Sequence, residues 1–511
     1  MAQSRLKNSI NNSMAAVGSL LLITILNFIN RSVFIRVLGS EYLGINGLFS
    51  NILSMLSLSE MGIGTAIVFN MYRAVETKDE TLINQLMSFY AKVYTIIGCV
   101  IMAFGIICSF FIQYFIKDNP FDLTFLRISF LLLVFNNAVS YFWSYRSCIV
   151  FANQKDWVCK LSSIIVMLIG SVLQIAALLL TKNYIVYLVI QVIVTICNNG
   201  VQFILSKKMY PSVSVSIHSH LPKDIFKDIV NRVKALIVHS ISSALNFGTD
   251  NIIISKFVGI LETGYYSNYS MIINTLSSLI TQLLGGVTAS MGNLMISGSK
   301  DKIYEIFKKI NFLCHWIFGL ISVGMLCVIN QFINIWTGPG HLLNNITVMI
   351  LVINFYILGA RQAIMVTRNA GGLYTNDRIV AIIKPIINLV FSVVLVQKIG
   401  ISGVFIGTFI SQLVADVILF PLFLFKGLFE KNLMNYYLNY VKNFLLATIS
   451  GAVSVLIISF AEGFFSGILL FIISGVTAVL VYNILFVMIN FKTDEFKYFT
   501  NLIKDKLLKI S

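Results

Sequence analysis

Long apolar segments recur along the whole chain and limit its fold more than any other feature. A helix needs about 20 residues to cross the hydrocarbon core of a bilayer, which is about 30 Å thick. Helices are required there because lipid offers no hydrogen-bond partner to backbone groups. The sequence contains 57% hydrophobic and 11% charged residues, whereas soluble domains contain about 25% charged residues. We therefore expect an all-α integral membrane protein.

About fourteen segments are long and apolar enough to cross a membrane, and few residues remain for loops or for a soluble domain. The first is too long and too polar for a cleavable signal peptide. The segments lie near residues 14–37, 43–70, 88–116, 124–150, 161–181, 184–206, 235–257, 265–296, 310–334, 343–366, 378–397, 402–425, 440–461 and 465–490.

The basic residues indicate the orientation of the chain. If the N-terminus is cytoplasmic, most of the 37 Lys and Arg fall in or near cytoplasmic segments, as the positive-inside rule requires. Both termini are then cytoplasmic, and the net charge of +16 serves orientation and contact with anionic lipid rather than nucleic acid. The seven cysteines form no close pair, so we expect neither a disulfide framework nor a metal site.

A weak internal repeat becomes visible when the sequence is shifted by 220 positions. Residues 34–57 then lie on 254–277, and a basic residue followed by two glycines five apart occurs in both segments. Six apolar segments separate the copies, an even number, so both halves share one orientation. Parallel repeats of this kind are related by an axis along the membrane normal. The matched pairs are Arg36 and Lys256, Gly39 and Gly259, Gly44 and Gly264, and Ser50 and Ser270.

The repeat predicts two pseudo-symmetric six-helix lobes and two further helices. The N-lobe is expected over 1–206 and the C-lobe over 235–426. The polar stretch 207–234 is expected to be a cytoplasmic linker with an interfacial helix. Residues 427–511 supply the last two membrane helices and a basic cytoplasmic tail.

Polar side chains form stripes within several apolar segments. Asn27 and Arg31 lie on one face of the first segment, with Asn30 beside them, and His239, Asn246 and Asp250 lie on one face of the seventh. Buried charges are expensive in a membrane, so such stripes indicate a wet cavity or mutual pairing. Further stripe residues are Gln191 and Asn198 on the sixth segment, Arg361 on the tenth, Lys384 and Asn388 on the eleventh and Asp416 on the twelfth.

These stripes favour a cationic cavity for an anionic, hydroxyl-rich substrate, because Arg grips phosphate oxygens with a planar fork. The candidate pyrophosphate- and sugar-binding residues are Arg31, Asn27, Asn30, Arg361, Lys384, Asn388, Gln191, Asn198 and Asn246. The candidates for ion coupling or for pairing between the lobes are Asp250, Asp416, His239 and Glu60. A coupling ion, H⁺ or Na⁺, is the only cofactor considered. Two structural alternatives remain: an Arg31–Asp250 ion pair, and cations near helix ends that snorkel to the surface.

The segment "NRSVFIRVLGSEYLGINGLFSNILSMLSLSEMGIGTAIVFNMY" (30–72) resembles the N-terminal signature of Wzx-type polysaccharide flippases. These belong to the multidrug/oligosaccharidyl-lipid/polysaccharide exporter superfamily. The resemblance covers length, number of spans, duplicated halves and the Glu-x-Gly-Ile-Gly of Glu60 to Gly64. It implies a functional cationic residue at Arg31 only.

The resemblance implies a flippase in the bacterial cytoplasmic membrane. Its substrate would be an undecaprenyl-pyrophosphate-linked oligosaccharide repeat unit, moved from the inner to the outer leaflet by alternating access. There the product would feed a polymerase of capsule, O-antigen or exopolysaccharide. The alternatives are a flippase for a peptidoglycan or teichoic acid precursor, a cation-coupled multidrug antiporter of the same superfamily, and a non-transporting scaffold or polymerase. No nucleotide-binding loop and no large extracytoplasmic carboxylate-bearing loop is found in the sequence, so we expect a transporter rather than an enzyme.

Overall fold

The computed structural model describes residues 2–57, 63–216, 219–373 and 377–508, and the side chains of 235–247 lie outside the described part. These residues fold into helices, with no strand among them, which confirms the predicted all-α class. The chain divides into two compact units, Met1–Ser267 (unit 1) and Asn268–Ser511 (unit 2). The boundary falls within the long helix α11 (Ile260–Ser297).

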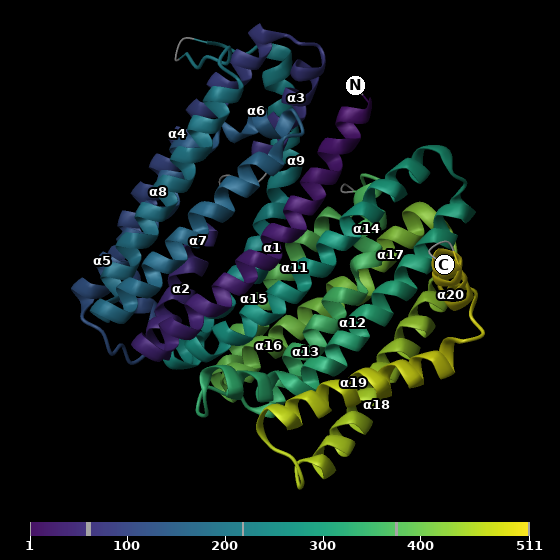
Figure 1. The fold of residues 1–511 in the computed structure, drawn as a ribbon. Helices are drawn as coiled ribbons and strands as arrows, with labels where there is room; N and C mark the ends of the chain where they lie inside the picture. The colour runs from purple at the N-terminus through teal and green to yellow at the C-terminus, as the bar shows by residue number, and fades with distance from the viewer. Residues whose placement is uncertain (1, 58–62, 217–218, 374–376, 509–511) are drawn as a thin grey trace. The chain divides into compact units, whose positions relative to one another are not determined.

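Each unit consists of long helices and shorter connecting ones (Figure 1). Before α11, unit 1 contains α1 (Ala2–Leu38), α2 (Ser40–Leu56), α3 (Ile63–Glu76), α4 (Glu80–Phe111) followed by the 3₁₀-helix η2 (Ile112–Phe115), α5 (Leu123–Ser144), α6 (Ser147–Ala152), α7 (Asp156–Thr181), α8 (Tyr184–Met209), α9 (Lys223–Gly248) and α10 (Asp250–Phe257). After α11, unit 2 contains α12 (Lys300–Thr337), α13 (Asn345–Ala360), α14 (Gln362–Ala370), α15 (Arg378–Ile399), α16 (Ile401–Gln412), the π-helix η3 (Leu413–Leu419), α17 (Phe420–Leu424), the π-helix η4 (Phe425–Phe429), α18 (Leu433–Ala461), α19 (Gly467–Asn490) and α20 (Asp494–Leu508).

Eleven helical segments of the described residues are long and apolar enough to cross a membrane. They correspond to all the predicted segments except the second, seventh and eighth. The second is divided between α2 and α3, and the seventh breaks at Thr249 between α9 and α10. The helix predicted within the linker is not separate, because α9 begins at Lys223 and continues into the seventh segment. The count of fourteen thus stays a prediction.

The helices of the two halves begin in the same way. Asp79 caps α4 by accepting a hydrogen bond from a backbone N–H at 2.9 Å, and Ser299 caps α12 in the same way at 3.4 Å. Asp122 and Asn344 cap α5 and α13, at 2.8 Å and 2.7 Å. Such caps satisfy N–H groups that lack a partner within the helix. The caps are 220 and 222 residues apart, which supports the repeat.

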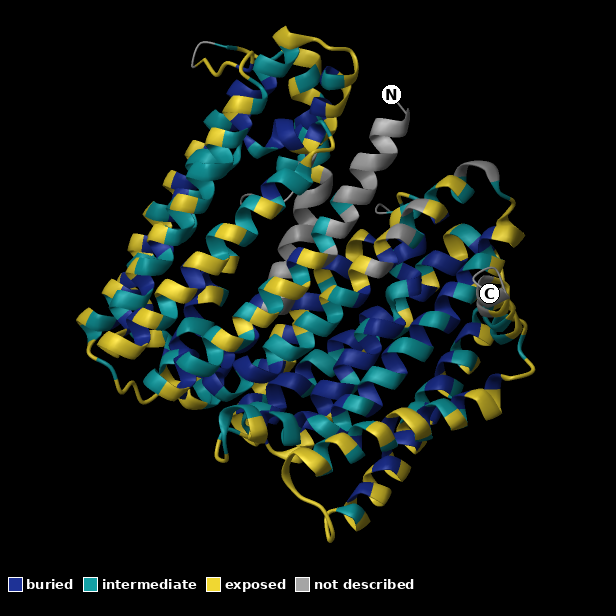
Figure 2. Ribbon diagram, in the orientation of Figure 1, coloured by how far each residue is buried: buried dark blue, intermediate teal, exposed yellow. Residues whose placement is uncertain are grey.

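The packing pairs also recur within each unit. In unit 1, α5 contacts α4 and α8, and α8 contacts α7 (Figure 1). In unit 2, α13 contacts α12 and α16, and α16 contacts α15. Buried residues concentrate along α12 and α13, the dark blue helices of unit 2 in Figure 2. Each half therefore builds its core from the same arrangement of helices.

Two matched glycines lie in contact within unit 1, where α2 meets the first turns of α11. A Cβ added at Gly44 would overlap the carbonyl oxygen of Ile260, and one added at Gly264 would overlap the carbonyl oxygen of Ser40. Ser40 and Ile260 are themselves 220 residues apart and begin the two helices. The contact is therefore reciprocal, as at an interface with two-fold symmetry. Only glycine allows two helix backbones to approach this closely.

The linker between α8 and α9 is fastened to unit 1. The buried Arg146 donates a hydrogen bond from Nη2 to the carbonyl oxygen of Val213 at 2.7 Å. The backbone N–H of Ser214 donates to Oδ1 of Asn84 on α4 at 2.9 Å. The linker is thus held by side chains of two different helical regions.

Arg146 has a counterpart in unit 2. Its guanidinium lies over the ring of Phe203 at 5.0 Å, and that of Arg368 lies over Phe420 at 5.6 Å. The arginines are 222 residues apart, like the first residues of α5 and α13, and the rings are 217 apart, like those of α8 and α16. Arg368 also forms a buried ion pair with Asp377. Both halves therefore contain the same cation–ring contact.

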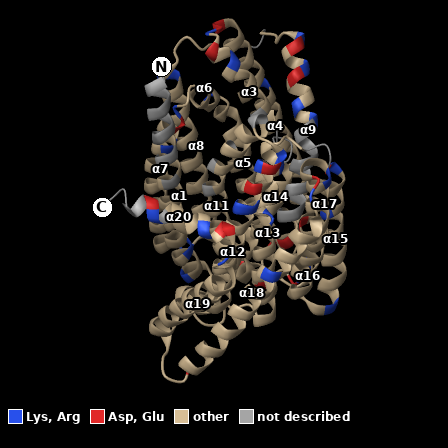
Figure 3. Cartoon of the chain, turned by 90° about the vertical axis from the view of Figure 1, so that its right-hand side faces the viewer, with Lys and Arg blue, Asp and Glu red and all other residues tan. Residues whose placement is uncertain are grey.

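The helices α18 and α19 lie outside the repeat and pack on α12. Tyr482 of α19 donates a hydrogen bond to the backbone carbonyl of His315 at 3.0 Å, and Trp316 Nε1 donates to Oδ1 of Asn483 at 3.0 Å. The whole of α19 carries no charged residue, and it is tan along its length in Figure 3. These contacts make the two helices part of unit 2.

Candidate functional site

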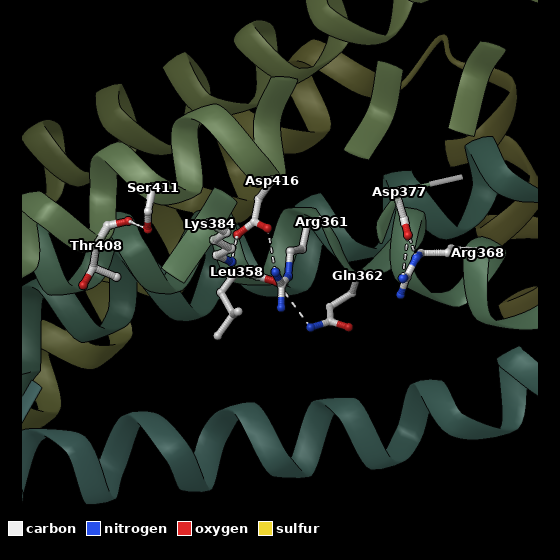
Figure 4. Close-up of polar contacts among 9 residues, drawn as sticks. All are labelled: Leu358, Arg361, Gln362, Arg368, Asp377, Lys384, Thr408, Ser411 and Asp416. Carbon is white, nitrogen blue, oxygen red and sulfur yellow. Dashed lines mark hydrogen bonds and ion pairs between the residues drawn. The ribbon is translucent and has the colours of Figure 1, made fainter. Parts of the chain in front are cut away.

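Three charged side chains meet in the core of unit 2 (Figure 4). Asp416 accepts a hydrogen bond from Nη1 of Arg361 at its Oδ1 and one from Nζ of Lys384 at its Oδ2, each at 2.6 Å. Only 1% of Asp416 is exposed. Since two cations surround one carboxylate, the cluster carries a net charge of +1.

Irregular backbone positions each of the three residues. Arg361 lies at the junction where α13 ends and α14 begins. Lys384 immediately precedes Pro385 inside α15, and a proline removes one backbone hydrogen bond from the helix interior. Asp416 lies in the π-helical segment η3. Single π-turns within α-helices occur often at functional sites.

The cluster can accept an additional anion. Removing one partner from a buried ion pair is costly, so two cations and one carboxylate persist only if the geometry is good. Nε of Arg361 is buried without a hydrogen-bond partner in the described part of the chain. The Arg361 side chain is 17% exposed, and its planar fork suits the oxygens of a phosphate.

A neutral polar stripe continues from the cluster along α15 and α16. Asn388, one turn after Lys384, donates from Nδ2 to Oγ1 of Thr408 at 3.0 Å. Oδ1 of Asn388 and Oε1 of Gln412 are buried and have no hydrogen-bond partner among the described residues. Thr408 was not predicted, although it lies one turn before Gln412 on the same helix.

The predicted residues of α1 lie in unit 1. Nδ2 of Asn30 donates to Oγ of Ser171 on α7 at 3.0 Å. Arg31 is half-buried and interacts electrostatically with Tyr187 of α8. Asn27 is exposed. Tyr187 was not predicted as a neighbour of Arg31, because it gives no polar spacing signal of its own.

The predicted residues of α8 form a neutral network. Gln202 donates from Nε2 to Oγ of Ser163 at 2.8 Å and to Oδ1 of Asn198 at 3.5 Å. Gln191 is half-buried. Asn199, 217 residues before Asp416, donates to Oγ of Ser140 at 3.2 Å. In the repeat, an amide in unit 1 therefore stands where unit 2 has the carboxylate.

The proposed coupling residues differ in how far the structure describes them. Oδ2 of Asp250 accepts a hydrogen bond from the hydroxyl of Tyr266 at 3.4 Å, and its Oδ1 is buried without a partner among the described residues. Both partners of Asp416 lie in its own unit. Glu60 and the side chains of His239 and Asn246 lie outside the described part. The Arg31–Asp250 pair stays a hypothesis.

Together, the recurring helix packing, the eleven apolar helical segments and the buried charged cluster define a multi-pass membrane protein with a transporter fold. The chain matches the family of polysaccharide biosynthesis proteins over residues 9–289, more than half its length. It therefore belongs to that family. A search of curated proteins found no significant match.

Solved structures of transporters share this fold. A structure described as the inward-facing conformation of a multidrug resistance MATE family transporter of the MOP superfamily has a TM-score of 0.65 and 15% identity, and the match covers 81% of this chain and 98% of that one. The lipid II flippase MurJ in an inward closed conformation gives 0.64, 16%, 93% and 98%. A point mutant of the Vibrio cholerae MATE transporter VcmN gives 0.58, 15%, 84% and 98%. The resemblance to this superfamily is confirmed.

Proposed function

We propose that the protein is a flippase for undecaprenyl-pyrophosphate-linked oligosaccharide repeat units. It moves them from the inner to the outer leaflet of the bacterial cytoplasmic membrane, for assembly into a cell-surface polysaccharide by a polymerase. Membership of the polysaccharide biosynthesis family supports this proposal. The observation that carries it is the net positive cluster of Arg361, Lys384 and Asp416 inside an apolar unit.

The substrate chemistry fits these groups. A pyrophosphate diester carries two negative charges, which Arg361 and Lys384 neutralise. Asn388 and Thr408 offer amide and hydroxyl groups to sugars near the same site. Arg31, Asn27, Asn30 and the α8 amides supply a second polar surface in unit 1. Two negative charges moved outward across the whole field gain about 4–5 kcal/mol per 100 mV.

The test compares two lysines of the same helix in a strain that lacks the chromosomal gene. Lys384→Gln removes a cation of the cluster, whereas Lys398→Gln removes an exposed one at the end of α15. We expect the Lys384→Gln strain, and likewise an Arg31→Ala strain, to lose surface polymer and to accumulate lipid-linked oligosaccharide in the inner leaflet. The Lys398→Gln strain should make normal polymer.

Membrane levels of each variant are measured by immunoblot. Normal polymer from Lys384→Gln at wild-type levels would overturn the assignment of the cluster. Accumulation of peptidoglycan or teichoic acid precursor in the deletion strain would favour the precursor flippase instead. Loss of drug efflux with normal polymer would favour the antiporter.

A further inference from the structure

Asp416 holds the same two cations that a phosphate group would need. Each carboxylate oxygen binds one of them at 2.6 Å, so Arg361 and Lys384 both have a bound anion already. We propose that Asp416 is an exchangeable internal counter-ion, which releases Arg361 and Lys384 to the substrate's phosphates when it takes up a proton. This inference rests on the proposed function and adds a coupling mechanism to it.

The electrostatics of the cluster require such an exchange. With an ionised Asp416 in place, a pyrophosphate at Arg361 would bring like charges into contact in a buried environment, where repulsion is poorly screened. The charged groups that face Asp416 are Arg361 and Lys384, and Tyr436 and Tyr440 of α18 interact with it electrostatically. Among these, only Asp416 can lose a negative charge by protonation at ordinary pH.

The proton balance is simple. On binding, the Asp416 carboxylate takes one proton from water and becomes a neutral acid, and the two cations transfer their hydrogen bonds to phosphate oxygens. On release of the headgroup, Asp416 returns the proton and binds the cations again. One proton is therefore taken up and released for each substrate, and no bond other than O–H is formed or broken.

Access and backbone geometry agree with this exchange. Arg361 is the partly exposed member of the cluster, whereas the Asp416 side chain is fully buried. An arriving anion therefore meets the guanidinium first. Asp416 lies on a π-helical turn, where the backbone departs from regular α-helical geometry and a side chain can be re-aimed by a shift of that turn.

The repeat supplies the test variant. Asn199 occupies the equivalent place in unit 1, so an amide is compatible with this packing, and Asp416→Asn removes the proposed competitor without changing shape. Asp377→Asn is the matched control, because it takes the carboxylate from another buried ion pair of unit 2, that with Arg368.

The experiment measures binding of farnesyl pyrophosphate, a short polyprenyl pyrophosphate, to the purified full-length protein in detergent. Calorimetric titrations at pH 6, 7 and 8, in buffers of different ionisation enthalpy, give affinity and proton uptake together. For wild type we expect uptake of one proton per ligand above that of Asp416→Asn. Relative to that variant, the wild-type affinity should rise about tenfold for each unit of decrease in pH.

The ligand's own phosphate titration is common to all variants and cancels in this comparison. At pH 8, Asp416→Asn should bind at least tenfold more tightly than wild type, while Asp377→Asn should match wild type in both affinity and proton uptake. Tight, pH-matched binding by wild type and Asp416→Asn alike would overturn the exchange and leave the proposed function intact.

Two other outcomes also decide the question. Absence of binding by wild type and by Asp416→Asn would overturn both the exchange and the proposed phosphate site. If Asp416→Asn fails to fold, the wild-type titration still decides, because the exchange requires proton uptake in excess of that measured with farnesyl pyrophosphate and free arginine. Wild-type binding without that excess overturns the proposal.

Discussion

Replacing Gly44 by alanine tests the close crossing of α2 and α11. The added Cβ would overlap the carbonyl oxygen of Ile260 and lie 3.0 Å from its carbonyl carbon and 3.1 Å from the backbone nitrogen of Gly264. All three atoms belong to backbone, so no side-chain rotation relieves the overlap, and the helices must move apart. Overpacking of this kind costs about 1–3 kcal/mol, and we take the upper half of that range because the obstacle is backbone.

The intrinsic gain from alanine in a helix is about 1 kcal/mol, so the net loss should be about 1–2 kcal/mol. At about 2–4 °C per kcal/mol for a domain of this size, the midpoint of thermal unfolding should fall by about 2–8 °C. The control is Gly200→Ala in α8, where an added Cβ meets no atom within 4 Å. That variant should unfold at or above the wild-type midpoint when both are scanned in the same detergent at the same rate.

A double variant makes the test sharper. Once the helices have moved apart for Gly44→Ala, the Cβ of Gly264→Ala meets less resistance, so the double variant should lose less stability than the two single losses together. Neighbouring sites that share one backbone shift typically couple by about 0.5–3 kcal/mol. The reasoning fails if Gly44→Ala unfolds with Gly200→Ala, or if the two losses add fully.

Two further predictions concern the linker end of unit 1. Arg146→Met leaves the carbonyl of Val213 without its donor, so limited proteolysis should cut residues 206–222 faster than in wild type at equal protein stability; an unchanged cutting rate would contradict the contact. Hydrogen bonds from Arg232 and Asn70 hold the pKa of Asp228 below its usual range, so this carboxylate stabilises the start of α9 above that range and the contribution is lost as the pH falls through its pKa. Hydrogen exchange in the first turns of α9 should therefore accelerate below about pH 4 in wild type, with no such step in Asp228→Asn; equal pH profiles would count against it.

The sequence predicts which segments are helical and apolar, because the membrane dictates their length and composition. It does not predict where a helix breaks inside such a segment. The break at Thr249 and the junction at Arg361 both occur within apolar runs, and hydropathy is insensitive to one lost backbone hydrogen bond. The spacing of Gly39 and Gly44 was more informative, since the matched spacing of Gly259 and Gly264 predicted a repeat that the reciprocal backbone contact supports.

The charged cluster was predicted in its members and not in its pairing. Helical spacing indicated that Lys384, Arg361 and Asp416 are buried within apolar segments. The cations were assigned to substrate and the carboxylate to an ion, because sequence spacing compares residues within one helix. Their hydrogen bonds join residues 32 and 55 positions apart, and only the packing of α13, α15 and α16 decides such partners.

The cation–ring contacts of Arg146 with Phe203 and of Arg368 with Phe420 bear on how this protein evolved. A contact present in both halves, at matching places, was inherited from the single gene that duplicated. The carboxylate of Asp416 has no such twin, since its counterpart is Asn199, so that position diverged after the duplication. The scaffold is therefore older than the present charge asymmetry, which marks the point at which one copy specialised.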